Sequence, residues 1–378
     1  MKRILFVAVS ATLLAAGCQK TKIINQINPT GEPSMTFTTS MGKLTKASGG
    51  QSDAEGDGMA NLQAQDFRVW VYGAENFSHT QENDMIGYDK MLNLPVTYSA
   101  AGWGTAKQHF WPGQKKELKF FAVSADKEFM GEETGPGSVS PVSPDAESKT
   151  LTVNGFVSTN ADYNTDLMVA DFVQQDQTNK TVDLWFRHAL SKVQFAFNTV
   201  IADGINVFVQ KVEVKGLKTS GNLAVSFDEA NKNHTVFQWT LDAEATADFI
   251  DDWETPVSEG MGFPEKIEGS SDVSDEDKKS MKITSIKDTD AQPNIFTTWL
   301  VLPQEVEDKK VEITYLMNER QFLAEFNLAY DALRQTTEKA MWNDNQFIRY
   351  VVTLAPNLIS FNPQVGEWDD PENLETQN

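Results

Sequence analysis

Cysteine is almost absent from this chain, because Cys18 is the only one among 378 residues. A disulfide within the chain needs two cysteines, so none can form, and zinc sites built from several cysteines are excluded as well. The stability of the folded chain must therefore come from core packing. The sequence supplies 40% hydrophobic and 10% aromatic residues for that core.

Basic residues are scarce relative to acidic ones. The chain has 32 Lys and Arg residues against 54 Asp and Glu residues, which gives a formal net charge of −22 at pH 7. A surface this acidic repels the phosphates of nucleic acids and of anionic lipid headgroups. We therefore expect no nucleic-acid partner and interpret the charge as a means of keeping an exposed protein soluble.

Motifs for catalysis and for metal or cofactor binding are also lacking. No His-Glu-x-x-His pattern, Gly-x-Ser-x-Gly turn or phosphate-binding loop is present, and the four histidines are far apart in the sequence. Residues 53–58 match the start of a calcium-binding loop, but Ala64 stands where the loop needs glutamate. The sequence predicts no enzyme, no cofactor and no metal site. A glycosidase needs only two carboxylates, and no motif distinguishes such a pair among the 54 acidic residues. His188 is expected to be a packed or capping residue at a domain junction.

Long hydrophobic runs are missing apart from a short one at the N-terminus. Lys2 and Arg3 precede the apolar residues 4–16, which are fewer than the roughly 20 residues that a membrane span needs. A charged start, a short apolar segment and a small-residue end are typical of a secretory signal. Cys18 directly follows Ala16 and Gly17, as in a lipoprotein signal, although Ala15 stands where leucine is commoner. We therefore predict a lipoprotein signal peptide over residues 1–18, with lipid on Cys18.

Residues 19–46 are predicted to hold a polar tether and one strand. The tether spans residues 19–33, and the strand is indicated by inward residues that alternate with polar ones: Met35, Phe37, Thr39 and Met41. Lys43 and Lys46 follow the strand, and residues 47–52 are rich in glycine and serine. A strand, two lysines and a flexible segment together indicate a boundary that is accessible to proteases.

The rest of the chain shows the period-two alternation of β-strands. We expect strands close to residues 67–72, 118–124, 182–186, 193–197, 207–214, 223–227, 237–241, 299–302, 311–315, 322–328 and 350–354. A phase slip at Gln210 and Lys211 predicts a β-bulge. Short helices are expected only within residues 328–340 and 242–253, and surface loops over 131–149 and 265–279. Many short strands at this spacing favour β-sandwiches over a parallel α/β sheet.

Several segments, taken together and in order, resemble the fimbrillin (type V pilin) family and its fimbrillin-like lipoprotein relatives. They are the signal ending at Cys18, Phe110–Gly113, Leu118–Ala122, Asp166–Ala170, Phe186–Val193, Val212–Leu217, Leu300–Gln304, Trp342, Tyr350–Leu354 and Val365–Trp368. The resemblance implies two tandem transthyretin-like, Greek-key β-sandwich domains with few short helices. It divides the chain into residues 1–18, 19–46, 47–187 and 188–378, and it implies an outer-membrane lipoprotein of the cell surface and the fimbrium.

The resemblance also implies a maturation step, in which a trypsin-like protease removes an N-terminal strand. A strand from the next subunit then fills the vacated groove, restoring the backbone ladder and the packing. In this sequence the removable strand carries Met35, Phe37, Thr39 and Met41, and the cut falls after Lys46 or after Lys43. The family favours arginine at the cut, whereas no arginine lies between Arg3 and Arg68.

The partners implied by the resemblance are other fimbrial subunits, in a homo- or heteropolymer, a lipid anchor in the outer membrane, and a host or bacterial surface ligand. Residues 358–368 are either a donor strand or a last core strand, and the acidic tail after Trp368 contains Pro371 and is a poor strand. A stalk subunit and a tip, anchor or accessory subunit therefore both stay open. The alternative is a non-polymerising surface lipoprotein that binds glycans through Trp103, Trp239 or Trp253, unless these side chains serve packing.

Overall fold

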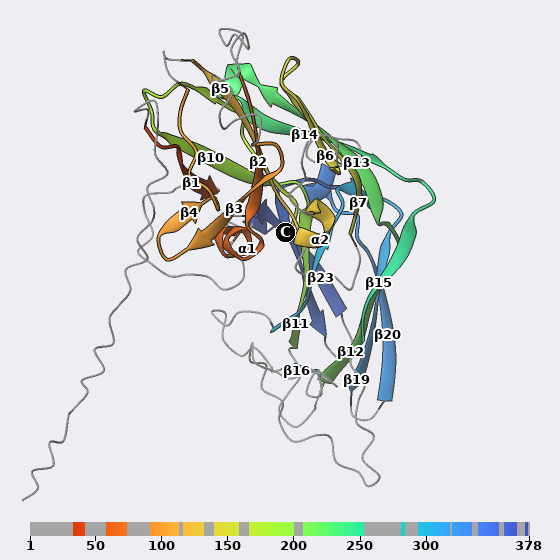
Figure 1. Cartoon of the computed structure of the whole chain (residues 1–378). Helices are drawn as coiled ribbons and strands as arrows, with labels where there is room; N and C mark the ends of the chain where they lie inside the picture. Colours follow the sequence, from red (N-terminus) through yellow and green to blue (C-terminus); the bar gives the residue numbers. More distant parts are fainter. Residues whose placement is uncertain are drawn as a thin grey trace, which may run out of the picture.

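A computed structural model describes most of the chain and shows a mostly β protein made of stacked sheets (Figure 1). The residues that it describes are 33–41, 58–73, 91–112, 116–131, 140–158, 166–199, 207–252, 281–283, 294–317, 320–334, 339–354, 359–368 and 375–376. The fold class expected from the sequence is confirmed.

The N-terminal body is built on an eight-stranded sheet with the order β1-β10-β8-β5-β2-β3-β4, and β9 lies beside β5. Its strands are β1 (Thr36–Met41), β2 (Phe67–Gly73), β3 (Leu94–Ser99), β4 (Gly102–Gly104), β5 (Leu118–Ser124), β8 (Met168–Ala170), β9 (Val173–Gln175) and β10 (Thr181–His188). One face of this sheet buries a core that includes Phe67, Phe120 and Phe186. Phe121 points to the other face, where a second sheet packs.

The second sheet has the order β14-β13-β7-β6. Its strands are β6 (Val142–Asp145), β7 (Thr150–Val157), β13 (Ser220–Asp228) and β14 (His234–Leu241). The hairpin of β13 and β14 comes from the predicted second segment, residues 188–378, yet it pairs with β7 of the first segment. The division of the chain near Arg187 stays a prediction, and this hairpin joins the two segments in one sheet.

The C-terminal body is a sandwich of two five-stranded sheets, β17-β11-β22-β23-β24 and β15-β12-β19-β20 with β16 beside β12. Its strands are β11 (Ser191–Thr199), β12 (Val207–Lys218), β15 (Thr246–Asp252), β16 (Met281–Ile283), β17 (Asn294–Val301), β19 (Lys310–Met317), β20 (Arg320–Asn327), β22 (Gln346–Leu354), β23 (Ile359–Glu367) and β24 (Glu375–Thr376). A two-stranded pair, β18 (Gln304–Glu305) and β21 (Met341–Trp342), also belongs to this body, since Trp342 is buried in its core. Alternating side chains of the two sheets meet in one core.

Several local predictions are confirmed. The pairing of β12 with β19 shifts register between Val209 and Lys211, where the sequence predicted a bulge. The hairpin of β19 and β20 closes with Met317 opposite Arg320, as the alternation on both sides of residues 317–320 predicted. Leu118–Ser124 is a strand, and all seven of its side chains are buried because both faces of the sheet are covered.

Other local predictions are wrong. Residues 246–252, expected to be helical, form β15, because their backbone pairs with β12. Residues 328–340 hold only a short 3-10 turn, η2 (Asp331–Arg334), in the part that the structure describes. Residues 142–145, expected in a loop, form β6 against β7. Three short helical elements were not predicted: α1 (Gly58–Gln65), α2 (Lys127–Met130) and η1 (Glu229–Asn231).

Candidate functional site

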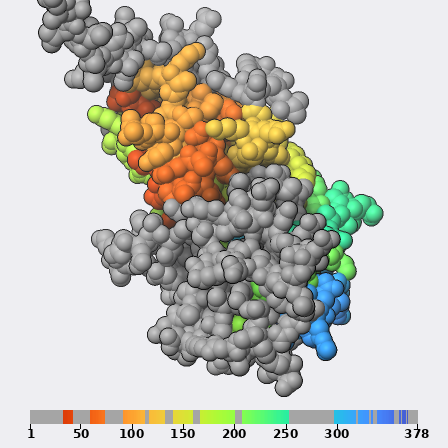
Figure 2. Space-filling model, turned by 90° about the horizontal axis from the view of Figure 1, so that it is seen from below, coloured from red at the N-terminus to blue at the C-terminus, as the bar shows by residue number. Residues whose placement is uncertain are grey.

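The four inward residues of the predicted N-terminal strand lie within β1, or next to it, at the edge of the eight-stranded sheet. Figure 2 shows this red segment at one end of the molecule, beside the orange residues of the β3–β4 region. Cys18, Lys43 and Lys46 lie outside the described residues, so lipidation and cleavage at these positions stay predictions.

On one side, β1 pairs with β10 in parallel, in a continuous register from Thr36 opposite Thr181 to Met41 opposite Phe186. The outward hydroxyls extend this pairing on the surface. Thr36 Oγ1 lies 3.0 Å from Thr181 Oγ1, and the Thr38 hydroxyl donates a hydrogen bond to the Asp183 carboxylate. Because parallel strands cannot be joined by a tight turn, β1 reaches this edge of the sheet through a long connection and pairs there with a strand about 145 residues later.

On its other side, the start of β1 is held by residues 109–111. Met35 N donates to the His109 carbonyl at 2.8 Å, and Trp111 N donates to the Pro33 carbonyl at 3.0 Å. The Trp111 indole, itself buried, donates to the Lys180 carbonyl at 3.0 Å just before β10 begins. The start of β1 is therefore fixed between two neighbouring segments.

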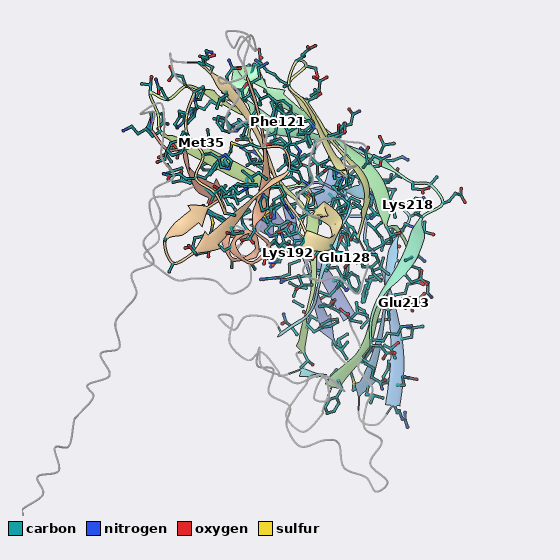
Figure 3. The ribbon with its side chains drawn as sticks, in the orientation of Figure 1. Met35, Phe121, Glu128, Lys192, Glu213 and Lys218 are labelled. Carbon is teal, nitrogen blue, oxygen red and sulfur yellow. The ribbon has the colours of Figure 1, made fainter. Side chains whose placement is uncertain are left out.

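The inward face of β1 fills an apolar groove, as the alternation predicted. Met35 and Phe37 are only 7% and 6% exposed, and Met41 packs against the same core. The Phe37 ring meets the Phe67 ring edge-on, with centroids 6.3 Å apart. Figure 3 labels Met35 at this end of the eight-stranded sheet.

Thr39 is the polar residue of that inward face, and its hydroxyl is bonded. The Trp103 indole Nε1 donates to Thr39 Oγ1 at 2.8 Å, and the Thr39 hydroxyl donates to Met59 Sδ at 3.6 Å. Trp103 belongs to β4 at the opposite end of the strand order, so the sheet curls until its two ends meet (Figure 1). The groove that holds β1 (the β1 groove) is thus formed by β10, residues 109–111, Phe67 and Trp103.

The hairpin that carries Trp103 is anchored by contacts that do not involve β1. The Trp103 ring packs on Phe67 and Tyr98, with centroids 4.9 and 5.0 Å apart. Tyr98 N donates to Asp66 Oδ1 at 3.0 Å. Asp66 ends α1 in a left-handed conformation, with φ of 64°, and its other carboxylate oxygen pairs with Lys127 at 3.3 Å.

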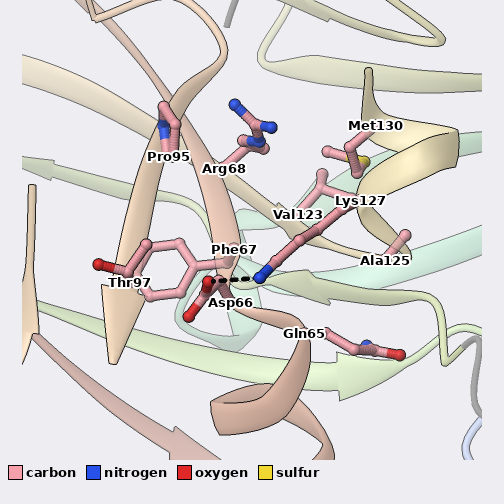
Figure 4. A pocket seen from close by; sticks show the side chains of 10 residues that line it. All are labelled: Gln65, Asp66, Phe67, Arg68, Pro95, Thr97, Val123, Ala125, Lys127 and Met130. Atoms are coloured by element: carbon pink, nitrogen blue, oxygen red, sulfur yellow. Dashed lines mark ion pairs between the residues drawn. The ribbon is translucent and has the colours of Figure 1, made fainter. Parts of the chain in front are cut away.

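A pocket of about 200 Å³ opens beside this anchor, between α2 and the start of β2 (Figure 4). Its cations serve the fold, because the Arg68 guanidinium donates to the carbonyls of Asn93 and Gly131 at 3.3 and 2.8 Å. Phe67 lines the pocket and also packs on Phe37, so the pocket and the β1 groove share one wall.

The junction below these strands contains the histidine that the sequence singled out. His188 is fully buried, and its Nδ1 lies 2.9 and 3.0 Å from the two carboxylate oxygens of Asp166. The His188 ring stacks on the Trp368 ring with centroids 3.9 Å apart and planes inclined by 2°. Gln65 of α1 exchanges two hydrogen bonds of 2.9 Å with the Asp166 backbone, so α1 is tied to the same junction.

The tryptophans suggested for glycan stacking have packing roles where the structure describes them. The Trp103 indole binds Thr39, and the Trp239 indole donates to the Ala189 carbonyl at 2.9 Å. Trp253 lies outside the described residues.

Within the described ranges, no three His, Cys, Asp or Glu side chains come close enough to share a metal ion. Of the helices in the part of the chain that is described, none has the length and apolarity of a bilayer span.

The sequence predicted the residues of β1 that face the groove but not the residues that form the groove. The alternation gave the inward residues of β1, but the partners β10 and Trp103 are distant in sequence. The left-handed Asp66 was also missed, since its only signal is an aspartate after a helix that was itself not predicted. Trp103 was noted as an aromatic residue, without an indication that its indole faces Thr39.

The fold and this groove define a class of β-proteins: two packed β-bodies in which a separate N-terminal strand completes a curled sheet. The family model described as fimbrillin-like matches residues 45–368, and the chain belongs to this fimbrillin-like family. The matched segment begins after β1 and ends at Trp368.

Solved structures have the same fold at low sequence identity. A fimbrial protein from Bacteroides vulgatus ATCC 8482 is similar with a TM-score of 0.52 and 14% identity, covering 89% of this chain and 100% of that one. A candidate cell adhesion protein from Bacteroides ovatus ATCC 8483 gives a TM-score of 0.50 and 12% identity, covering 89% and 98%. No curated protein matches this sequence.

Proposed function

We propose that this protein is a fimbrial subunit with a structural and adhesive role, held at the bacterial outer membrane by lipid on Cys18. It assembles when protease cleavage frees β1 and a strand from another subunit takes its place. The observation that carries this proposal is the β1 groove itself, in which a short N-terminal strand completes a sheet made by distant parts of the chain.

The energetics of the groove support a replaceable strand. Loss of β1 uncovers the side-chain sites of Met35 and Phe37, and burying a side chain of this kind is worth about 1.5–3 kcal/mol. It also leaves the backbone groups of β10 unpaired along one edge. An incoming strand with a similar alternation restores both contributions, so exchange needs no energy source other than folding.

The position of the predicted cuts also supports this function. Lys43 and Lys46 come directly after β1, and the family match begins at residue 45, so a cut there separates β1 from the segment shared by the family. The body that remains keeps its own two cores, one behind the eight-stranded sheet and one in the C-terminal sandwich.

The C-terminal strand favours a tip, anchor or accessory subunit over a repeating stalk subunit. β23 pairs with β22 along its whole length, its Val365 is buried, and Trp368 behind it is 1% exposed against His188. A strand so well integrated in its own sandwich is a poor donor to another molecule, because the sandwich would lose it.

Strand exchange after proteolysis tests the proposal. The chain from residue 19 onward is cut with trypsin and mixed with a fluorescent peptide of residues 33–42, and peptide uptake is followed by size-exclusion chromatography and intact mass. We expect the folded body to bind the peptide after the cut, and we expect the uncut chain not to bind it. The matched control carries Lys43→Gln and Lys46→Gln, which should stay uncut there and take up none. A cut body that keeps β1 and refuses the peptide would contradict the proposal.

A further inference from the structure

The β1 groove contains a polar recognition point in an otherwise apolar lining. Thr39 Oγ1 receives the Trp103 indole hydrogen at 2.8 Å, on the inward face where Met35, Phe37 and Met41 make apolar contacts. Both residues are partly buried, and a partly buried indole N–H loses free energy when it is offered no acceptor. A strand that offers a hydrogen-bond acceptor at the position of Thr39 therefore binds in the groove more tightly than a strand without one.

The donor of this hydrogen bond is held in place by residues other than β1. Phe67 and Tyr98 both pack on the Trp103 ring, and the Tyr98 backbone N–H is bonded to Asp66. Since the groove positions its donor in advance, discrimination between occupants costs little ordering of the groove. Met59 Sδ lies 3.6 Å from the same hydroxyl and is a second contact at this position.

We propose that the β1 groove selects an incoming strand by two features. Apolar side chains take the positions of Met35, Phe37 and Met41, and a threonine or serine in the position of Thr39 accepts the hydrogen bond from the Trp103 indole. This inference rests on the proposed function and names the partner of that site more closely. The partner is a strand of the type apolar-x-apolar-x-Thr/Ser-x-apolar.

The same rule excludes β23 of a second copy of this chain. The buried residues of β23 include Pro363 and Val365, and Phe361 on the same face packs on Tyr350. None of these side chains has a hydroxyl, and aligning Ile359 with Met35 brings Pro363 to the position of Thr39. Aligned in this way, β23 does not meet the rule, so the strand that enters the groove is not β23 of a second copy.

A double-mutant cycle in the intact full chain, purified in detergent, tests the recognition point without any strand exchange. Thr39→Val keeps the shape and removes the acceptor, while Trp103→Phe removes the donor. We expect each to lower the folding equilibrium constant by about tenfold, and the double variant to lose much less than the product of the two. Thr36→Val, which removes an exposed hydroxyl of the same strand, is the matched control. Independent, multiplicative effects at positions 39 and 103 would overturn the proposal.

Peptide competition in the same full chain tests selection directly. A protease site inserted between β1 and α1 makes the cut independent of Lys43 and Lys46. We expect the residue 33–42 peptide to displace β1 about tenfold better than its Thr39→Val form, with the preference lost in Trp103→Phe protein, and a peptide of residues 358–368 to fail. Equal binding of the two forms, or displacement by the β23 peptide, would overturn the selection. If even the native peptide fails to enter, the proposed strand exchange fails, while the cycle still judges recognition at Thr39.

Discussion

At the scale of single residues, Phe37 is the largest buried side chain of β1. It is 6% exposed and meets Phe67 in the core on the face of the eight-stranded sheet that β1 helps to cover. Phe37→Ala removes this ring and leaves a cavity, so we expect the free energy of unfolding to fall by about 3 kcal/mol. Chemical denaturation of the uncut chain measures the loss. Thr36→Ala, at an exposed position of the same strand, should change it by less than about 0.5 kcal/mol, and equal effects would contradict the burial of Phe37.

Asp344, in the turn before β22, gives a pH-dependent prediction. Burial raises the pKa of its carboxyl from 3.8 to about 6. The unfolded chain releases this proton near pH 3.8 and the folded chain only near pH 6, so the raised pKa costs stability as the pH rises through that window. We expect Asp344→Asn to be more stable than the natural chain by about 3 kcal/mol at pH 7.5, with the difference shrinking below about 1 kcal/mol at pH 4. Denaturant midpoints at both pH values check this, and a larger gain at pH 4 would contradict it.

Residue roles that follow from local alternation were predictable, and roles that depend on distant contacts were not. Met35 and Phe37 were assigned inward because a strand with one buried face repeats every two residues. The hydrogen bond from Trp103 to Thr39 joins residues 64 positions apart, and no local pattern records it. The raised pKa of Asp344 likewise comes from burial that only the folded chain creates.

At the scale of elements, the hairpin of β13 and β14 leaves little room for a side chain at Gly221. A Cβ atom at this position would lie 3.0 Å from the Thr240 carbonyl oxygen and 3.1 Å from the Leu241 side chain. We therefore expect Gly221→Ala to reduce stability by about 1–3 kcal/mol, measured as a lower melting temperature. Gly104→Ala is the matched control, since its Cβ would meet nothing within 4 Å. A Gly221→Ala variant as stable as this control would show that the hairpin adjusts freely.

Elements were predictable where side chains alternate over a long stretch. The bulge in β12 and the hairpin of β19 and β20 carry their own signals in phase and spacing. β15 was taken for a helix because its stretch mixes acidic and small residues, and only its pairing with β12 makes it a strand. Helix α1 was missed because Leu62 is the only fully buried residue among residues 59–65, whose burial the structure describes, so the helix has almost no apolar stripe.

At the scale of the whole molecule, the connection between the two bodies was not readable from the sequence. The β13–β14 hairpin completes the sheet of β6 and β7, and Trp368, near the end of the chain, stacks on His188 at the end of β10. Such long-range pairings are decided by the surfaces that the folded segments present. The family resemblance supplied the number of bodies, and the structure supplies how they are joined.

The central claim at this scale is that β1 has to leave its groove before another strand enters. In the chain from residue 19 onward no cysteine is present, so Thr36→Cys with Thr181→Cys adds one disulfide between neighbours whose hydroxyl oxygens are 3.0 Å apart. Thr36→Cys alone is the control.

The decisive measurement is uptake of the fluorescent residue 33–42 peptide by this double variant after trypsin cleavage, with and without reductant. We predict no uptake while the disulfide holds β1 against β10, and uptake like that of the natural chain once the disulfide is reduced. Equal uptake by the oxidised and reduced forms would contradict the account, because a strand would then bind without β1 leaving the groove.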